Sequence, residues 1–340
     1  MLRNTCATVD GMSSSFSTQT FWVYLNIDVF PTAWAAYRGL LISSSSHGTE
    51  GFRPLSYWPL GLVRNRQTLR LQKELRLEEI RCNFYPHQVS RLHGIYLWGD
   101  RASAERGQKR WGVEARSHFY SDYLVEAAFT YSAMSRVDTT WIDQYLLPDS
   151  ILLGKDNEGW MHSYWKGEPF PDTEPLWEHI VEGRGLVYGT TLRMKAYEIV
   201  KSHAPLSLGQ LELGRIAVEL GSDLYHSAPF IRRVARTKFR VDYFVDVHDE
   251  NDDFMEKLGQ HTIRVAQVDR SQINWDAINL LRDTTHRPDL RHMGFEFDST
   301  EFTDDEENFA RVIVSLYDGT IWAGLSEPAN SVKMPNMEER

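Results

Sequence analysis

The sequence predicts an α+β fold, because a clear helix and a clear strand follow each other within the first hundred residues. Over residues 69–81, Leu71 and Leu75 fall on one side of a helix, and Arg and Glu residues occupy the other sides. Pro86 prevents this helix from continuing, and the apolar, β-prone run from Leu92 to Trp98 predicts a strand. The chain has 340 residues, 42% of them hydrophobic, which is enough for one large or two ordinary domains.

The first forty residues predict an arm followed by a pair of strands. Residues 1–20 are rich in Ser and Thr, which is typical of a poorly ordered arm. Residues 21–42 carry many aromatic and β-branched side chains on both sides of Pro31, so we expect a strand, a turn and a second strand there.

Elements of both kinds are expected between the strand at 92–98 and residue 204. Asp100 has the side chain and the position of a helix N-cap. A proline-rich bend leads directly into Glu178, and such a rigid approach is a sensible way to fix the position of a carboxylate. We expect a helix at 100–111, a strand at 120–131, a short helix at 139–147 and the bend at 169–175.

The chain changes in character near residue 204. Residues 205–340 carry 15 Lys and Arg against 25 Asp and Glu, whereas residues 61–116 carry 12 basic against 6 acidic side chains. We therefore predict three parts, which are the arm at 1–20, a first domain at 21–204 and a second, acidic, mixed α/β domain at 205–340. In the second domain we expect helices at 206–224 and 275–281, strands at 231–247 and 309–322, and acidic loops at 248–256 and 298–307.

Three short segments occur in an order that is typical of one enzyme superfamily. A His-Gly-Thr at 47–49, a Gly-Ile-Tyr at 94–96 and a glutamate that heads an apolar segment at 178–181 give the order His, Tyr, Glu. This order resembles the ADP-ribosyltransferases. A helix that leads through a proline turn to a Ser-Arg strand, at 75–98, and the Tyr-Trp-Lys-Gly at 164–167 resemble a bacterial and phage-associated branch. The resemblance covers about residues 30–200 and implies a split β-sheet core with helices.

The resemblance also implies that NAD is the substrate and that ADP-ribose is transferred to a macromolecule. Tyr96 would stack on nicotinamide, because an aromatic face attracts a flat cationic heterocycle. Glu178 would stabilise the positive charge that develops as the glycosidic bond breaks. Ser90 and Arg91 would contact the amide and the phosphates of NAD, since arginine can bind a diphosphate through two hydrogen bonds. Ser103 would hold the nicotinamide amide.

The first motif has two candidates. Arg38 lies in an apolar stretch and is similar to the arginine variant of the family's opening strand. His47 instead follows four serines, which are typical of a flexible loop. Either residue would bind the adenosine-side ribose or the diphosphate of NAD, and Arg38 is slightly favoured.

Each of these residues also has a structural explanation. A tyrosine in an apolar strand is most often part of the core, and Glu174 and Glu182 compete with Glu178 in the same bend. Under the enzyme hypothesis, the chain is a toxin or phage-conflict effector whose acceptor is nucleic acid or protein. The basic stretch 61–116 would suit a nucleic-acid acceptor, because it would attract polyanions. The opposing hypothesis is a non-catalytic structural or binding protein of phage or immunity type.

Composition limits the compartment and the metal chemistry. Cys6 and Cys82 lie far apart and match no metal or redox spacing, which favours a reducing compartment, the cytoplasm. No apolar run predicts a membrane span, and the acidic stretch at 246–260 lacks the glycine and glutamate that an EF-hand requires, so we expect no metal. The basic run at 232–240 is better explained as a strand face that pairs with the acidic loops than as a nucleic-acid strip.

Overall fold

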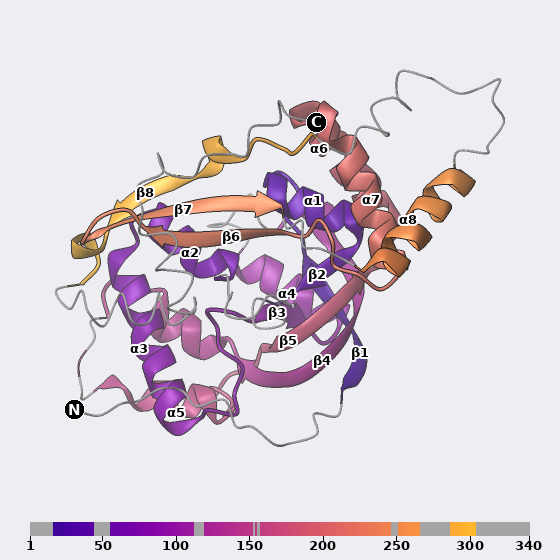
Figure 1. Cartoon of the computed structure of the whole chain (residues 1–340). Helices are drawn as coiled ribbons and strands as arrows, with labels where there is room; N and C mark the ends of the chain where they lie inside the picture. Colours follow the sequence, from indigo (N-terminus) through magenta and orange to yellow (C-terminus); the bar gives the residue numbers. More distant parts are fainter. Residues whose placement is uncertain are drawn as a thin grey trace.

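The computed structural model describes residues 16–43, 55–111, 119–151, 154, 157–245, 251–265 and 286–303, with side chains as far as 260 in the sixth of these ranges. Among them, helices and antiparallel strands form a mixed fold (Figure 1), which confirms the α+β prediction. His47 and the elements expected at 275–281 and 309–322 lie outside the described residues.

A five-stranded antiparallel sheet forms the centre of the first two hundred residues. Its strands are β1 (Ser17–Tyr24), β2 (Leu40–Ile42), β3 (Ile95–Trp98), β4 (Leu124–Asp138) and β5 (Trp177–Val187). Strand β5 pairs with β2, β3 and β4, and β1 pairs with both β3 and β4. The pairing therefore runs in a closed ring through β5, β3, β1 and β4, with β2 added to β5.

Different helices cover the two faces of this sheet. Leu97 and Val181 belong to one hydrophobic cluster, whereas Tyr96 and Ile180 belong to another, because successive strand residues point to opposite faces. The helices on the first face are α1 (Phe30–Arg38), α6 (Thr190–His203) and α7 (Leu208–Glu219), and those on the second are α3 (Thr68–Phe84) and α5 (Gly159–Trp165).

The turn expected around Pro31 is wrong, because a helix occupies this place. Helix α1 has Pro31 in its first turn, where the missing N–H of proline leaves no intrahelical bond unmade. The helix ends at Gly39, whose φ of 82° suits glycine best. Helix α1 is buried on nearly all sides, so its sequence is apolar all round and lacks the spacing that identifies a surface helix.

Two other expectations are also wrong in part. The predicted arm at 1–20 is too long, because residues 17–20 belong to β1 and pair with β4. Residues 252–256 of the acidic loop expected at 248–256 belong instead to α8 (Asp252–Val265), and residues 248–250 lie outside the described residues. Asp252 and Asp253 lie in the first turn of α8, where the helix dipole favours negative charge. Helix α6 lies where no helix was predicted.

The other predicted elements of the first part are present with shifted ends. The helix expected at 69–81 is α3, and the helix expected after Asp100 is α4 (Arg101–Trp111). Asp100 caps α4, since its Oδ1 accepts the Ser103 N–H at 2.7 Å. Strand β3 begins only at Ile95, because the chain before it makes a turn. The strand expected at 120–131 is the first part of β4, and the short helix after it is a single π-helical turn over Ile142–Leu146.

A second sheet contains β6 (Ser227–Arg233), β7 (Lys238–Val245) and β8 (Phe295–Asp298), all antiparallel. It packs against α3 and α2 (Tyr57–Arg64), where Phe239 and Phe297 share a hydrophobic cluster with Leu60 and Leu71. The hydrophobic cluster that contains Leu97 and Val181 also includes residues of α1, α6 and α7. Two cores therefore cross the boundary predicted at residue 204, and these contacts give no support to a separate accessory domain.

No helix among the described residues is long and apolar enough to cross a membrane.

Candidate functional site

Strand register places Tyr96 and Glu178 on the same face of the first sheet. Trp98 is the partner of Glu178, and Tyr96 is the partner of Ile180, in the antiparallel pair β3–β5. Directly paired residues point to the same face, which here is the face covered by α3 and α5. Gly94 permits this close packing, because a Cβ atom there would lie 2.4 Å from the Ile180 Cγ2 atom. The glycine of the Gly-Ile-Tyr segment therefore makes room for β5.

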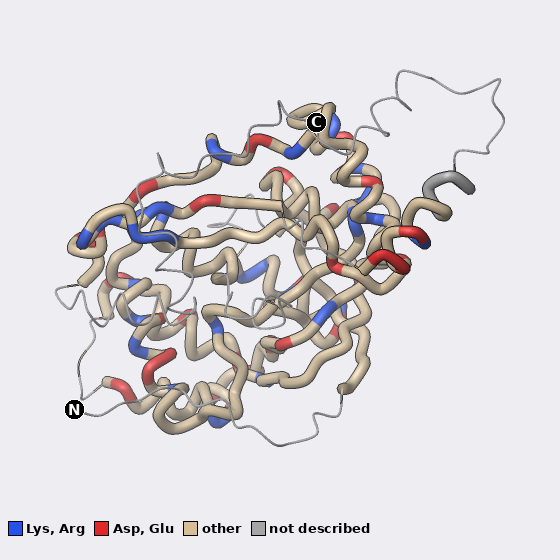
Figure 2. Tube along the Cα trace, in the orientation of Figure 1, with Lys and Arg blue, Asp and Glu red and all other residues tan. Residues whose placement is uncertain are grey.

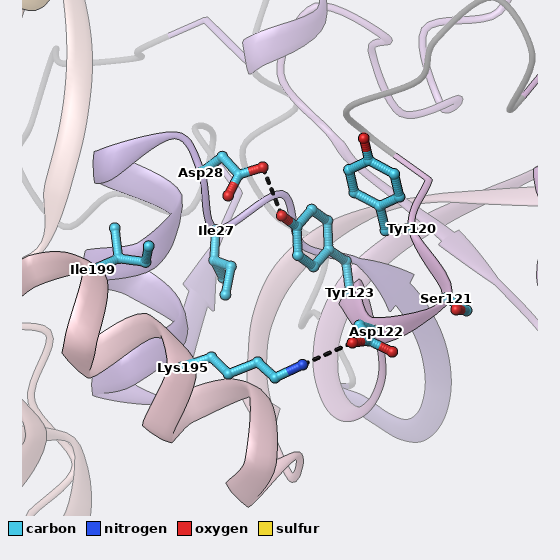
Figure 3. Close-up of a pocket in the computed structure, with 8 residues that line it drawn as sticks. All are labelled: Ile27, Asp28, Tyr120, Ser121, Asp122, Tyr123, Lys195 and Ile199. Carbon is cyan, nitrogen blue, oxygen red and sulfur yellow. Dashed lines mark hydrogen bonds and ion pairs between the residues drawn. The ribbon is translucent and has the colours of Figure 1, made fainter.

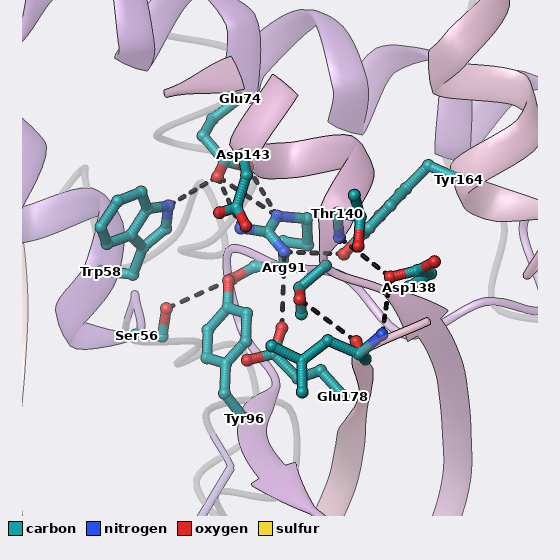
Figure 4. Close-up of polar contacts among 12 residues, drawn as sticks. Ser56, Trp58, Glu74, Arg91, Tyr96, Asp138, Thr140, Asp143, Tyr164 and Glu178 are labelled. Atoms are coloured by element: carbon teal, nitrogen blue, oxygen red, sulfur yellow. Dashed lines mark hydrogen bonds and ion pairs between the residues drawn. The ribbon is translucent and has the colours of Figure 1, made fainter. Parts of the chain in front are cut away.

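Arg91 lies close to both of these side chains (Figure 4). Its Nη1 atom is 3.9 Å from the Glu178 Oε2 atom, and its guanidinium carbon is 5.1 Å from the centre of the Tyr96 ring. The Tyr96 hydroxyl donates a hydrogen bond of 2.5 Å to the Arg91 carbonyl oxygen. Three of the residues predicted from the sequence are thus brought together.

Two further residues hold the Arg91 guanidinium in place. Glu74 of α3 accepts from Nε at 3.0 Å and from Nη2 at 2.9 Å, which is a forked carboxylate pair. Tyr164 of α5 accepts from Nη1 at 2.7 Å. Trp58 of α2 donates its indole N–H to Glu74 at 2.6 Å. The guanidinium fork that was expected to bind phosphates is therefore occupied by Glu74.

The network is almost completely withdrawn from solvent. Glu74 and Arg91 are 1% and 4% exposed, Tyr164 is fully buried, and Glu178 is 7% exposed, whereas Tyr96 is only partly buried. Buried charges persist in proteins when they are paired and hydrogen-bonded, as Glu74 and Arg91 are. Glu178 has the weaker interaction with Arg91, since 3.9 Å is too long for a hydrogen bond.

The pKa of Glu178 is raised to about 7. Burial is the main cause, because it penalises the charged carboxylate. Arg91 opposes the shift, and the negative charges of Asp143 and Glu74 add to it. Burial also raises the pKa of Tyr96 well above its usual value, so its hydroxyl remains a donor. A carboxyl group that titrates near neutral pH beside an aromatic ring is typical of catalytic sites, and structural networks also produce such shifts.

A buried carboxylate also organises the approach to Glu178. Asp138, at the end of β4, accepts the backbone N–H of Phe170 at 2.9 Å and of Leu176 at 3.1 Å. These bonds fix both ends of the proline-rich bend. Asp143 lies in the following π turn, accepts the Trp111 indole N–H at 2.6 Å and has its pKa raised by burial.

The two predicted serine contacts have local partners. The Ser90 hydroxyl accepts the Leu92 N–H at 3.1 Å, and the Ser90 carbonyl accepts the Gly94 N–H at 2.8 Å. The Ser103 hydroxyl donates to Asp100 at 2.9 Å as part of the N-terminal cap of α4. Ser90 therefore builds the turn before β3, and Ser103 builds the start of a helix.

Arg38 does not join Tyr96 and Glu178. It ends helix α1 instead of lying on an opening strand, and α1 covers the opposite face of the sheet. Its Nη2 atom donates to the carbonyl oxygens of Asp223 and Leu224, at 2.9 and 2.6 Å. These bonds tie α1 to the segment after α7, so the structure brings Arg38 to a different place from the other predicted site residues.

Glu74 and Tyr164 complete the network and are not among the site residues that the sequence predicts. Glu74 lies three residues after Leu71 and three before Leu77, on the apolar side of the predicted helix, where a carboxylate is unexpected. A carboxylate at such a position indicates a buried charge with a partner, so Glu74 could have been found from the sequence. Tyr164 belongs to the Tyr-Trp-Lys-Gly segment before Glu178, and no spacing rule connects it with Arg91.

Carboxylates from other parts of the chain neutralise much of the basic stretch at 61–116. Its local positive charge is therefore smaller than its composition indicates, which weakens the argument for a polyanionic acceptor. The pairs are Arg70 with Asp149, Arg76 with Glu158, Arg106 with Glu174 and Arg110 with Asp143.

Some basic residues of the run at 232–240 form ion pairs, and others are exposed to solvent. Arg232 and Arg240 both bind Asp242, and Arg240 also lies 3.4 Å from Glu296. The partners are thus strand residues of β7 and β8, whereas the prediction named the acidic loops. The exposed basic residues gather at the turn between β6 and β7 (Figure 2). In the described part of the chain no group of three His, Cys, Asp or Glu side chains could hold a metal ion.

The chain matches no known protein family model and no curated protein.

Proposed function

We propose that the chain is an NAD-dependent ADP-ribosyltransferase in which Glu178 drives the transfer. The observation that carries the proposal is the common position of Tyr96, Arg91 and Glu178 on one sheet face, with Glu178 titrating near neutral pH. A ring for nicotinamide and a carboxylate for the developing charge are the two groups that this chemistry needs.

In this reaction an acceptor nucleophile forms a bond to C1′ of the nicotinamide ribose while the bond from C1′ to the nicotinamide nitrogen breaks. The nitrogen keeps the electron pair, nicotinamide leaves as a neutral molecule, and the acceptor loses a proton. Positive charge develops on the ribose ring, and an ionised Glu178 would stabilise it. Because the pKa of Glu178 is about 7, we expect the rate of transfer to rise as the pH passes through that value.

Arg91 has a positioning role in this proposal. Its backbone carbonyl accepts the Tyr96 hydroxyl and so fixes the orientation of the ring that would receive nicotinamide. Its guanidinium, held by Glu74 and Tyr164, keeps a positive charge near Glu178. That charge favours the ionised carboxylate which the reaction requires.

Burial favours a second candidate, which is a purely structural network in a non-catalytic protein. Arg91, Glu74 and Tyr164 are almost inaccessible, and Arg91 already lies over the Tyr96 ring. Networks of this kind rigidify a core when every member has a partner. The two candidates differ in whether NAD binds at all.

A thermal-shift titration with NAD and with nicotinamide tests the proposal. Ligand that binds only the folded protein raises the melting temperature by mass action. We expect a rise for the wild type and for Glu178→Gln, and a smaller rise for Tyr96→Leu, because stacking on the ring contributes roughly 1–3 kcal/mol. Glu182→Gln, on the same strand, is the matched control and should behave as the wild type. An unchanged wild-type melting temperature at saturating NAD would leave only the structural candidate.

A further inference from the structure

A hollow lies near the start of β4, at the opposite end of this strand from the residues that pair with Glu178. Figure 3 shows the side chains that line it. Glu178 pairs with Val137 near the end of β4, whereas the hollow is built around Tyr123, immediately before the first residue of that strand. The connection from β1 to α1, the short helix at 121–123 and helix α6 supply its walls. Its volume of about 520 Å³ lies in the usual range for small-molecule sites.

The charges in this hollow leave one carboxylate in excess. Lys195 of α6 lies 2.7 Å from the Asp122 carboxylate, so these two charges neutralise each other. Asp28 accepts the Tyr123 hydroxyl through Oδ2 at 2.6 Å. A neutral hydroxyl does not cancel the charge of Asp28, and burial and Asp28 itself raise the pKa of Tyr123, which keeps that hydroxyl protonated. The three charged side chains therefore sum to one negative charge.

Apart from Ser121, the remaining walls are aromatic and apolar. Tyr120 is 49% exposed, and the centre of its ring lies 5.3 Å from that of Tyr123, edge to face. Ile27 and Ile199 line the hollow from the opposite elements. A hollow lined by both an exposed tyrosine ring and a carboxylate attracts a cation through the face of the ring and through the charge of the carboxylate. Apolar walls favour a flat or hydrocarbon body over a compact hydrated ion.

We propose that this hollow binds a guanidinium group. The guanidinium ion is planar and weakly hydrated, so it suits a site that offers an aromatic ring for stacking, here Tyr120, and a carboxylate for hydrogen bonds, here Asp28. An ammonium ion can satisfy the charge but cannot stack in this way, and an anion would meet the excess carboxylate. The group can belong to a small molecule or to an arginine side chain of a peptide. This inference is independent of the proposed transferase activity.

Ligand-observed NMR titrations of the full chain test the inference with four probes, which are methylguanidinium, a blocked arginine tripeptide, the matching lysine tripeptide and inorganic phosphate. We expect both guanidinium probes to bind more tightly than lysine, and phosphate not to compete. If the arginine tripeptide binds more tightly than methylguanidinium, the hollow is a peptide site. If the arginine tripeptide and methylguanidinium bind equally tightly, it is a small-molecule site. Asp28→Asn should weaken guanidinium binding about tenfold, since a hydrogen bond to a charged group contributes roughly that factor or more.

Two further variants make the outcome decisive. Tyr120→Leu keeps an apolar wall and removes the ring, so it should also weaken guanidinium binding, and it does not touch the Asp28 contact. Glu198→Gln removes a carboxylate from α6 that does not line the hollow, and it should leave binding unchanged. No binding at about 10 mM probe, equal affinity for the lysine and arginine tripeptides, or equal losses in Asp28→Asn and Glu198→Gln would overturn the inference.

Discussion

At the scale of single residues, Glu178 combines a chemical advantage with a cost in stability. A carboxyl group in water has a pKa near 4.5, so raising that value to about 7 means that the folded protein disfavours the ionised form. Strain of this kind is common at sites where stability is exchanged for function. The charge that would serve catalysis is therefore a charge that the fold disfavours.

Glu178→Gln should stabilise the protein at high pH and not at low pH. Below about pH 4.5 Glu178 is protonated in both the folded and the unfolded chain, so the amide changes little. As pH rises through 4.5 toward 7, Glu178 ionises in the unfolded chain before it ionises in the folded protein, so the free energy of unfolding of the wild type falls. The free energy of unfolding of Glu178→Gln should therefore exceed that of the wild type by about 3 kcal/mol at pH 8. Urea unfolding at pH 4 and pH 8 measures this. Equal differences at both pH values would show that Glu178 is not strained.

Glu74→Gln should be strongly destabilising, because it leaves the Arg91 guanidinium buried without its paired charge. Removing one partner of a buried ion pair costs about 3–5 kcal/mol. Glu79→Gln is the matched control on the same helix, since Glu79 pairs with Arg76 at the surface and such pairs contribute about 0.5 kcal/mol. Chemical denaturation at pH 7 measures the free energy of unfolding of both variants. Similar decreases in Glu74→Gln and Glu79→Gln would contradict the role assigned to Glu74.

At the scale of elements, periodicity predicted α3, which has a polar side, and failed for α1, which has almost none. It also did not predict α6, although the buried residues of α6 lie on one side. Helix α3 alternates apolar and charged faces, so its existence could be predicted from Leu71 and Leu75. Helix α1 is buried almost all round, and its aromatic composition imitates a strand pair. The candidate site could likewise be predicted only in part from the sequence. The alternation of β3 and β5 is encoded locally, but the meeting of Glu74 with Arg91 depends on tertiary packing that no single-sequence rule supplies.

The packing of α4 on β3 gives a prediction at this scale. A Cβ atom on Gly107 would lie 2.6 Å from the Trp98 indole, and Trp98 is the strand partner of Glu178. We expect Gly107→Ala to cost about 1–3 kcal/mol, as overpacking usually does. Gly61→Ala in α2 meets nothing within 4 Å and should instead stabilise the chain by about 0.5–1 kcal/mol. Thermal unfolding of both variants checks the contrast, and a stabilised Gly107→Ala would contradict this packing.

At the scale of the whole molecule, the described residues after 204 complete cores that the earlier residues begin. Phe239 and Phe297 cover Leu60 and Leu71, and the Trp34 indole N–H donates to the Tyr225 carbonyl at 2.8 Å. The charge boundary in the sequence therefore does not mark a boundary in packing. Composition reports on solvation of the surface, whereas domain limits are set by which apolar faces meet.

A fragment that ends at Ala204 should fail to fold. It would expose the apolar face of α2 and α3 and leave Arg38 without the carbonyl oxygens of Asp223 and Leu224. Expression, solubility and cooperative thermal unfolding of the fragment check this expectation. A soluble fragment with a sharp unfolding transition would support a separate accessory domain at 205–340.

The central claim is that Glu178 breaks the glycosidic bond of NAD, and release of nicotinamide tests it most directly. The full chain is incubated with NAD and with separate protein, RNA and DNA acceptor pools at pH 8, where Glu178 is ionised. We predict release by the wild type and by Glu182→Gln, and a loss of about 100-fold or more in Glu178→Gln, as for the removal of one electrostatic stabiliser. Absence of release with every pool, or equal release by Glu178→Gln, would contradict the account.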